Sequence, residues 1–172
     1  MNTNIKKKPS TTGKVPSRIK NYSSRSDLSS IFEVIRQSLA THKAKRVMFE
    51  YDEDGRATSI SFMMEVNGER FSFQLPNRFE RVKALVLKAY REQGDYIAED
   101  RLNDQAYRTS WANIRDWILA QMALIDSQMV KTEEVFFPYL LDQSGRTAFE
   151  TFEQRLALPE PGQYRIVEER KT

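Results

Sequence analysis

Three consecutive carboxylates, Asp52-Glu53-Asp54, are the side chains with the clearest potential for metal chemistry in this sequence. Hydrolysis of phosphate esters commonly uses two or more carboxylates that converge on Mg²⁺, with a lysine or another acid nearby. Here the acids precede Gly55, and aspartate favours such turns because its side chain bonds the local backbone. No second acidic segment of the Asp…Glu-x-Lys kind follows. The pattern therefore favours a solvated turn, and we predict no metal site.

Other reactive residue types are scarce. The chain of 172 residues has no cysteine and one histidine, His42, which excludes disulfide frameworks, thiolate zinc sites and histidine-based triads. His42 lies at the C-terminal end of a predicted helix, where positive side chains are ordinary partners of the helix dipole. Neither a glycine-rich phosphate loop nor a G-x-S-x-G motif occurs. We expect a non-enzymatic protein without a cofactor; a metal-dependent nuclease is the enzymatic alternative.

Positive charge is concentrated in the first 25 residues. This segment has no acidic residue, whereas the rest of the chain has 20 basic and 24 acidic residues, a net charge of −4. Much of the remainder of the segment is Ser, Thr, Pro and Gly, so it cannot bury enough surface to offset its ordering entropy. We expect residues 1–25 to be a disordered arm that contacts anionic polymers. Its basic residues are Lys6, Lys7, Lys8, Lys14, Arg18, Lys20 and Arg25.

The arm has alternative interpretations. It could be a leader that only aids solubility, or it could dock on a protein or a membrane surface. A membrane is the weakest of these partners, because the arm has no apolar or lipidated anchor and the chain has no run of about 18 apolar residues. A predicted second helix carries five basic residues that could extend the arm into a basic strip, although Glu80 and Glu92 interrupt it: Arg78, Arg81, Lys83, Lys88 and Arg91.

Hydropathy patterns predict a helix followed by three strands in the first half of the chain. Apolar residues at three- and four-residue spacing indicate a helix over 27–42. Strict alternation indicates strands over 46–51, 58–66 and 70–75. Asn67-Gly68, between the last two strands, is typical of a type I′ hairpin turn. We expect an antiparallel meander with one face on the core and one in water. The wet face would carry Arg46, Ser59, Ser61, Arg70, Ser72 and Gln74, either for phosphate contact or as a merely solvated surface.

The second half of the chain is predicted to be helical. A helix over 78–93, capped by Asn77 and Glu80, is followed by a polar loop over 95–102 and a long helix over 104–130. A short helix then begins at Thr132 and is interrupted by Pro138, and a last helix begins with a capping box of Thr147 and Glu150. The apolar residues expected to face inward include Met129, Phe149, Phe152 and Leu156. The aromatic residues expected to form a packed core between helices are Trp111, Trp117, Phe136, Phe137 and Tyr139.

Together these elements predict a single α+β domain over 26–158, in which a helix and a three-stranded meander precede a helical half that packs on one sheet face. The arm 1–25 precedes this domain. A C-terminal tail over 159–172 follows it, and residues 163–167 could form a loose edge strand.

Several segments resemble a family of small uncharacterised proteins carried by bacteriophages, prophages and other bacterial mobile elements. The likeness rests on four segments: 60–62 with 73–76, the tryptophan-bearing block 111–125, the Val135-Phe136-Phe137-Pro138-Tyr139 motif, and Gly145-Arg146-Thr147. The resemblance implies the cytoplasm of a bacterial or phage-infected cell and no established reaction. It does not extend to the basic arm.

The order helix, three strands, helix over 27–93 is also similar to the double-stranded-RNA-binding domain. That family grips a duplex through its first helix, its first hairpin loop and a lysine cluster at its second helix. This sequence has an acidic loop at 52–55 and no lysine run after Asn77, so the likeness is topological.

We therefore expect an accessory protein that binds the backbone of DNA or RNA through its arm and an arginine-bearing surface. The alternative is a protein-interaction module, such as an inhibitor or a subunit of a larger complex, without affinity for nucleic acid.

Overall fold

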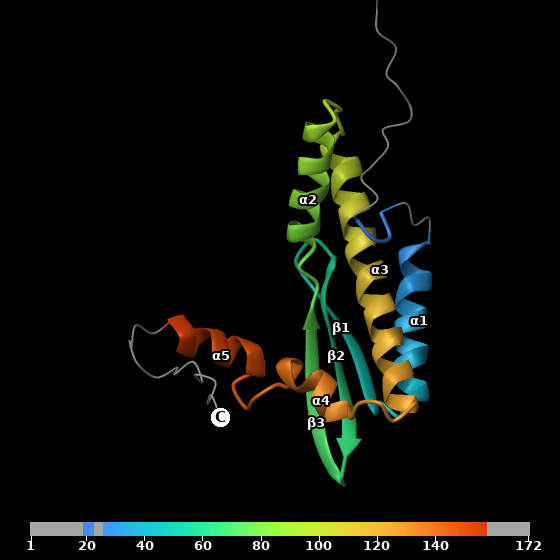
Figure 1. Ribbon diagram of the computed structural model, residues 1–172, viewed down its shortest axis with the longest axis vertical. Coiled ribbons are helices and arrows are strands. Elements are labelled where there is room, and N and C mark those ends of the chain that lie inside the picture. The colour runs from blue at the N-terminus through green and yellow to red at the C-terminus, as the bar shows by residue number, and fades with distance from the viewer. Residues whose placement is uncertain (1–18, 23–25, 158–172) are drawn as a thin grey trace, which may run out of the picture.

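The structure confirms the α+β class. The computed structural model describes residues 19–22 and 26–157, in which a helix and a three-stranded antiparallel sheet precede a helical second half (Figure 1). Helices α1 (Leu28–Thr41) and α3 (Glu99–Asp126) lie next to each other on one face of the sheet. The predicted tail 159–172, with its possible edge strand, lies outside the described residues.

The sheet is the predicted meander, with strand order β1-β2-β3. Its strands are β1 (Arg46–Tyr51), β2 (Ala57–Val66) and β3 (Glu69–Pro76). Asn67 and Gly68 have φ values of 54° and 84°, which confirms the turn that requires positive φ at both central positions. The register shifts between Glu50 and Tyr51 in β1.

The core lies between the inner face of the sheet and the two helices. Ile31, Ile35 and Leu39 of α1 are fully buried, as the spacing predicted. Trp111 of α3 is also fully buried, and its ring packs edge-on against Phe32 at 4.9 Å and Phe49 at 5.6 Å between ring centroids. One aromatic side chain therefore joins α3 to α1 and β1.

Helix α2 (Phe79–Glu92) extends past one end of the sheet and packs on the first half of α3 (Figure 1). The predicted polar loop over 95–102 is wrong in its second part, because α3 begins at Glu99. Leu102 is buried in a small cluster with Val86 and Ala89 of α2, and this packing extends α3 toward its N-terminus.

The long helix also ends earlier than predicted, at Asp126. Gln128 adopts a left-handed conformation with φ 58°, and the backbone N–H of Met129 turns back to the carbonyl of Leu124. This reversal leaves Met129 71% exposed, so its predicted inward position is wrong.

The C-terminal segment returns to the outer edge of the sheet. After α4 (Thr132–Phe136) and the short 3₁₀ helix η1 (Phe137–Tyr139), Leu140 forms an isolated bridge with Phe73 of β3, and the N–H of Leu141 donates to the carbonyl of Ser72. Phe136 is fully buried, whereas Phe137 is 61% exposed, so the prediction of a core position for Phe137 is wrong. Consecutive helical residues point about 100° apart, and only one of the two can face the sheet.

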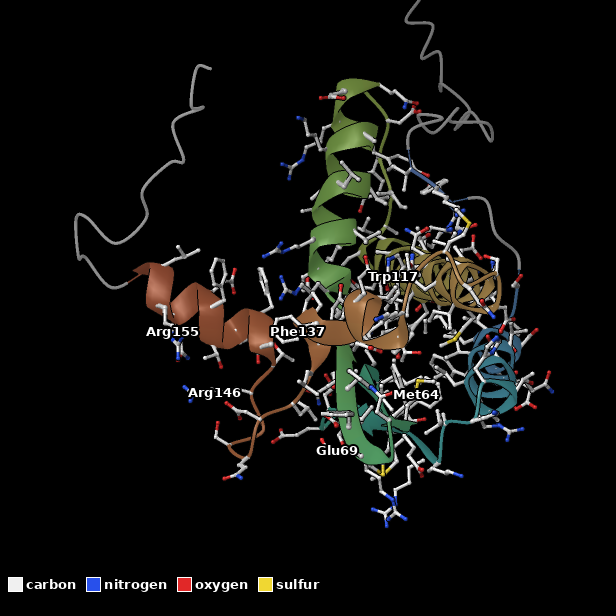
Figure 2. All side chains as sticks on the ribbon, turned by 60° about the horizontal axis from the view of Figure 1, so that its bottom comes forward. Met64, Glu69, Trp117, Phe137, Arg146 and Arg155 are labelled. Atoms are coloured by element: carbon white, nitrogen blue, oxygen red, sulfur yellow. The ribbon has the colours of Figure 1, made fainter. Side chains whose placement is uncertain are left out.

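The last helix, α5 (Ala148–Ala157), projects away from the sheet and from α3 (Figures 1 and 2). Its capping box is confirmed, because Thr147 Oγ1 accepts from the Glu150 N–H and a Glu150 carboxylate oxygen accepts from the Thr147 N–H. The predicted inward face is wrong: Phe149, Phe152 and Leu156 are 39%, 49% and 50% exposed. The face is apolar as predicted, but the described part of the chain only partly covers it.

Candidate nucleic-acid interface

Most of the predicted basic arm lies outside the described residues, including Lys6, Lys7, Lys8, Lys14, Arg18 and Arg25. The described part of the arm is Ile19–Tyr22, which forms a turn that packs on the domain. At these four residues the prediction of a disordered arm over 1–25 is wrong. Ile19 joins the cluster of α2 and α3, and the Tyr22 and Tyr90 hydroxyls are hydrogen-bonded at 2.6 Å. We call Ile19–Tyr22 the anchor, because it fixes where the arm is attached.

A carboxylate of α3 holds the polar side of the anchor. Asp116 accepts a hydrogen bond from the Asn21 amide at 3.0 Å, and it pairs with Lys20 at 3.2 Å and Arg115 at 2.7 Å. Burial alone would raise the pKa of Asp116, but these three donors outweigh it and lower the pKa. Lys20 and Arg115 are therefore already paired, although the Lys20 side chain remains 70% exposed.

Helix α2 brings the other predicted basic residues together. Arg78 is the N-cap of α2, and Arg81 and Lys88 follow on the same exposed side, because intervals of three and seven residues keep side chains on one face. Arg91 extends this face, which we call the basic face of α2. Two acids interrupt it: Glu80 in the first turn of α2, and Glu92, which lies 3.8 Å from Lys88.

Neither Arg78 nor Arg81 forms an ion pair with a carboxylate of the described residues. The Arg78 guanidinium instead lies 5.9 Å from the ring centroid of Phe149 in α5, within the range of a cation–π contact. Both arginine side chains are thus exposed cations whose charge no described carboxylate neutralises.

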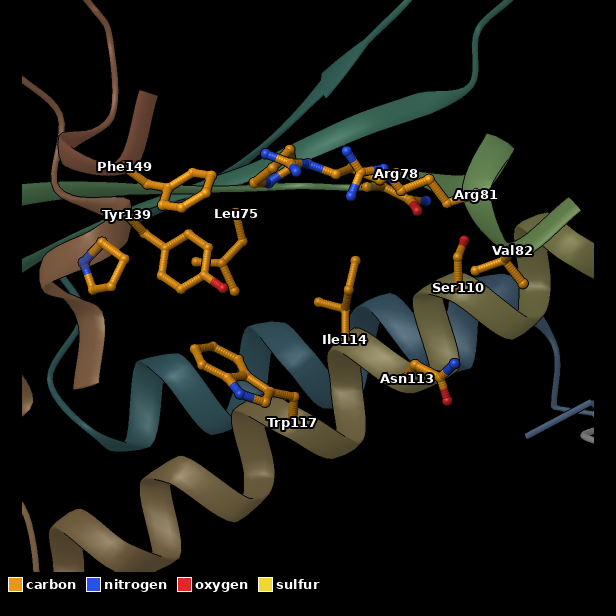
Figure 3. Close-up of a pocket in the computed structure, with 13 residues that line it drawn as sticks. Leu75, Arg78, Arg81, Val82, Ser110, Asn113, Ile114, Trp117, Tyr139 and Phe149 are labelled. Atoms are coloured by element: carbon orange, nitrogen blue, oxygen red, sulfur yellow. The ribbon is translucent and has the colours of Figure 1, made fainter. Parts of the chain in front are cut away.

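A cleft of about 610 Å³ opens beside these two arginines, between the end of β3, α2, α3, η1 and α5 (Figure 3). Trp117 and Ile114 of α3 face Leu75 and Tyr139 across it. The Trp117 and Tyr139 rings meet edge-on with 5.5 Å between centroids. The remaining lining residues are Pro76, Asn77, Arg78, Arg81, Val82, Ser110, Asn113, Pro138 and Phe149.

Asn77 is the unusual polar residue of this cleft. It was predicted to cap α2, but the N-cap is Arg78 and no side-chain cap forms, so that prediction is wrong. The Asn77 backbone N–H is bonded to the Thr58 carbonyl at 2.7 Å. The residue is only 9% exposed, and both polar atoms of its amide group lack a hydrogen-bond partner among the described residues. Buried polar groups are normally paired, so the donor and the acceptor of this amide are both unused in the free protein.

The unpaired Asn77 amide should destabilise the free protein. We expect Asn77→Leu, which keeps the branched outline of the side chain, to raise the free energy of unfolding by about 1 kcal/mol, since a buried unpaired polar group costs about 1–3 kcal/mol. Urea denaturation measures the change. As a control, Asn113→Leu should lower stability, because the Asn113 oxygen accepts from Asn21 at 2.9 Å. A loss of stability in Asn77→Leu would contradict the prediction.

The acidic turn and the histidine have structural roles. Asp52 Oδ1 accepts the backbone N–H groups of Asp54 at 3.1 Å and Arg56 at 2.8 Å, as expected for an aspartate that shapes a turn. The two ring nitrogens of His42 lie 2.6 Å from the Ser38 carbonyl and 2.9 Å from the Asp126 carboxylate. Burial alone would lower the pKa of His42, but these two acceptors outweigh it and raise the pKa.

The outer sheet face is a poor surface for phosphate. The Glu50 carboxylate accepts hydrogen bonds from Ser59 and Ser61 at 2.8 Å and from Gln74 at 2.7 Å. Burial alone would raise the pKa of Glu50, but the three donors lower it, so the carboxylate stays ionised. Ser59, Ser61 and Gln74, which were expected to contact a nucleic-acid backbone, are therefore already bonded to the negative charge of Glu50.

The sequence predicted the basic half of this interface and missed its cleft. Arg78, Arg81 and Lys88 were candidates. The predicted core positions of Trp117 and Tyr139 are confirmed, because both pack against the core, but that prediction did not show that they also line a cleft. Phe149 was wrongly assigned to the core and Asn77 to a cap. One signal in the sequence was available: Asn77 directly follows Pro76, at the junction of β3 and α2, where the helix can begin one residue later than a cap at Asn77 would require.

In the described ranges 19–22 and 26–157, no three His, Asp or Glu side chains gather as a metal ion would require. None of the helices there has the length and apolar character needed to cross a membrane. No family model, curated protein or solved structure matches the chain, so the resemblance to phage-borne proteins stays a prediction.

Proposed function

We propose that this protein binds nucleic acid without catalysing a reaction on it, through phosphates that contact the basic face of α2 and the N-terminal arm. The observation that carries the proposal is the grouping of Arg78, Arg81 and Lys88 on one exposed helix face. Exposed cations gain affinity for a polyanion by displacing its condensed counterions. Contact with phosphate alone carries no sequence information, so binding is largely independent of sequence.

The anchor supports a joint role for the two basic regions. Ile19 and Lys20 line a shallow depression together with Val82 and Leu85 of α2. Leu85 lies on the basic face, one helical turn from Arg81 and from Lys88. The arm is therefore attached beside the basic face, and one nucleic-acid backbone can contact both.

Neutralising the basic face should weaken binding strongly. We expect Arg78→Gln/Arg81→Gln/Lys88→Gln to reduce the slope of log affinity against log salt by about 2–3, since each phosphate contact contributes about 0.7–0.9. At about 0.1 M salt this corresponds to a loss of affinity of roughly 100-fold or more. Mobility-shift titrations of the full chain over a range of salt concentrations measure both quantities.

A matched control removes the same charge elsewhere. Lys43, Lys45 and Arg46 are exposed at the junction of α1 and β1. This junction lies at the end of the molecule away from α2 (Figure 1), and the triple glutamine variant should bind almost as the parent does. Equal losses in the two variants would show that only net charge matters, which contradicts a localised interface. Arm lysines should be neutralised in the full chain, because a truncation at residue 26 also removes the anchor.

A protein-interaction module is the second candidate function. The observation that favours it is the exposed apolar face of α5, formed by Phe149, Phe152 and Leu156. Unpartnered apolar surface of this kind often marks a docking site. The same titrations separate the two functions, because an interaction module should show no affinity for nucleic acid even at low salt.

A further inference from the structure

We infer that the cleft beside α2 receives one unstacked base of a single-stranded nucleic acid, while an adjacent phosphate lies against Arg78 and Arg81. The inference rests on the proposed function and names the form of nucleic acid that it would favour. It is carried by three features that meet at one place: an anion-binding end, an aromatic wall and an unpaired buried amide.

The anion-binding end is the start of α2. Arg78 and Arg81 are exposed there without carboxylate partners among the described residues, and the helix lacks a side-chain cap at its N-terminus. The positive end of the helix dipole adds to the two guanidinium charges, whereas Glu80 in the first turn opposes them. A phosphate is well suited to this end because arginine can hold it with two parallel hydrogen bonds.

The aromatic wall lies deeper in the same cleft. Trp117, Tyr139 and Phe149 line it from three separate elements, and its volume of about 610 Å³ is in the range of small-molecule sites (Figure 3). Aromatic side chains accept any base by stacking, because every base has a π-face. The aromatic wall and the arginines together fit an apolar ring attached to a phosphate.

The amide of Asn77 supplies the third feature. Asn77 lines the cleft, is nine-tenths buried, and has neither its donor nor its acceptor paired among the described residues. The edge of a nucleobase presents donors and acceptors side by side, so it can pair with both atoms of an amide. Both atoms of the Asn77 amide are buried in the free protein, so this pairing requires the side chain to turn toward the cleft. Neither an aliphatic ligand nor a bare phosphate would satisfy both atoms in this way.

This geometry favours a single strand over a duplex. In a duplex the bases are stacked and paired, and only the phosphates could reach the protein, at the basic face of α2. A base of a single strand can be splayed out into a pocket without the cost of unpairing. A single strand therefore uses both the arginines and the cleft, and a duplex uses the arginines alone.

The test compares two phenylalanines of α5 in the full chain. Phe149 lines the cleft, whereas Phe152, also exposed, lies outside it. The probes are fluorescein-labelled 20-nucleotide single strands of DNA and RNA and the corresponding duplexes, measured by anisotropy at one salt concentration. We expect the parent to prefer a single strand at least about tenfold, and Phe149→Ala to weaken single-strand binding about 5- to 150-fold, the loss associated with one stacked base. Phe152→Ala should change neither affinity. Because Phe149 also contacts Arg78, Phe149→Ala should weaken duplex binding, but by much less than it weakens single-strand binding.

Tryptophan emission gives a second readout. Trp111 is fully buried and Trp117 lines the cleft, so quenching by a single strand reports on Trp117 and should disappear in Trp117→Phe. Equal affinity of the parent for single strands and duplexes, with no effect of Phe149→Ala, would overturn the inference and leave the proposed function standing. Absence of binding to every probe would overturn both. Saturation of the cleft by a free mononucleotide, such as AMP, at concentrations that displace the single strand completely would assign the site to free nucleotides and overturn the inference.

Discussion

Replacing Trp111 with alanine should lower the free energy of unfolding by about 3–5 kcal/mol, the usual cost of removing a large aromatic side chain from a core. The side chain is fully buried, and it packs against Phe32 of α1 and Phe49 of β1, so its removal leaves a cavity where a helix pair meets the sheet. For a domain of this size the expected fall in Tm is roughly 6–20 °C. Thermal unfolding monitored by circular dichroism measures it.

An exposed aromatic residue provides the control for Trp111→Ala. Tyr96 is 88% exposed between α2 and α3, and Tyr96→Ala should change stability by no more than about 0.5 kcal/mol. A Trp111→Ala protein with the Tm of the parent would show that the core collapses around the missing ring, contrary to this expectation.

Phe136→Ala should have an effect of similar size, with an additional consequence for the cleft. Phe136 is fully buried and touches Phe62 of β2, Phe73 of β3 and Trp117 of α3, with ring centroids 5.2–5.7 Å apart. We expect a loss of about 3–5 kcal/mol in the free energy of unfolding. The Phe136 ring packs edge-on against Trp117, so its removal changes the surroundings of the indole and should also shift the emission spectrum of Trp117.

Its neighbour in the chain is the matched control. Phe137 is 61% exposed, so Phe137→Ala removes the same side chain one position away and should leave both stability and Trp117 emission nearly unchanged. Similar losses in the two variants would mean that the segment 136–137 acts through its backbone rather than through the buried ring.

The fold was largely predictable from short-range patterns. Alternation over 46–75 and the Asn67-Gly68 turn fixed the meander, because a strand exposes one face and a type I′ turn needs residues that tolerate positive φ. The errors in predicted burial occurred because the periodicity of a helix shows which of its faces is apolar but does not show which other element packs on that face. Phe149, Phe152 and Leu156 form an apolar stripe in sequence, yet α5 projects from the body and leaves them exposed.

The site was predictable only in its charged part. Arg78, Arg81 and Lys88 share a face because of their spacing alone. The cleft depends on contacts between residues 75–82, 110–117 and 138–149, which are far apart in the sequence. No local pattern reveals that Trp117 lies opposite Tyr139, or that Asn77 gives up its capping role and keeps its amide unpaired.

The two edges of the sheet differ in how they meet the chain. Leu140 and Leu141 meet the outer edge of β3 at Phe73 and Ser72, and the register shift between Glu50 and Tyr51 interrupts β1 at the other edge. An uninterrupted edge is a template on which a second chain can add a strand, and this is how amyloid-like stacks grow. With the middle of one edge occupied, and the other edge irregular with Lys45 and Arg46 at its start, neither edge offers a long regular template for a strand from a second copy.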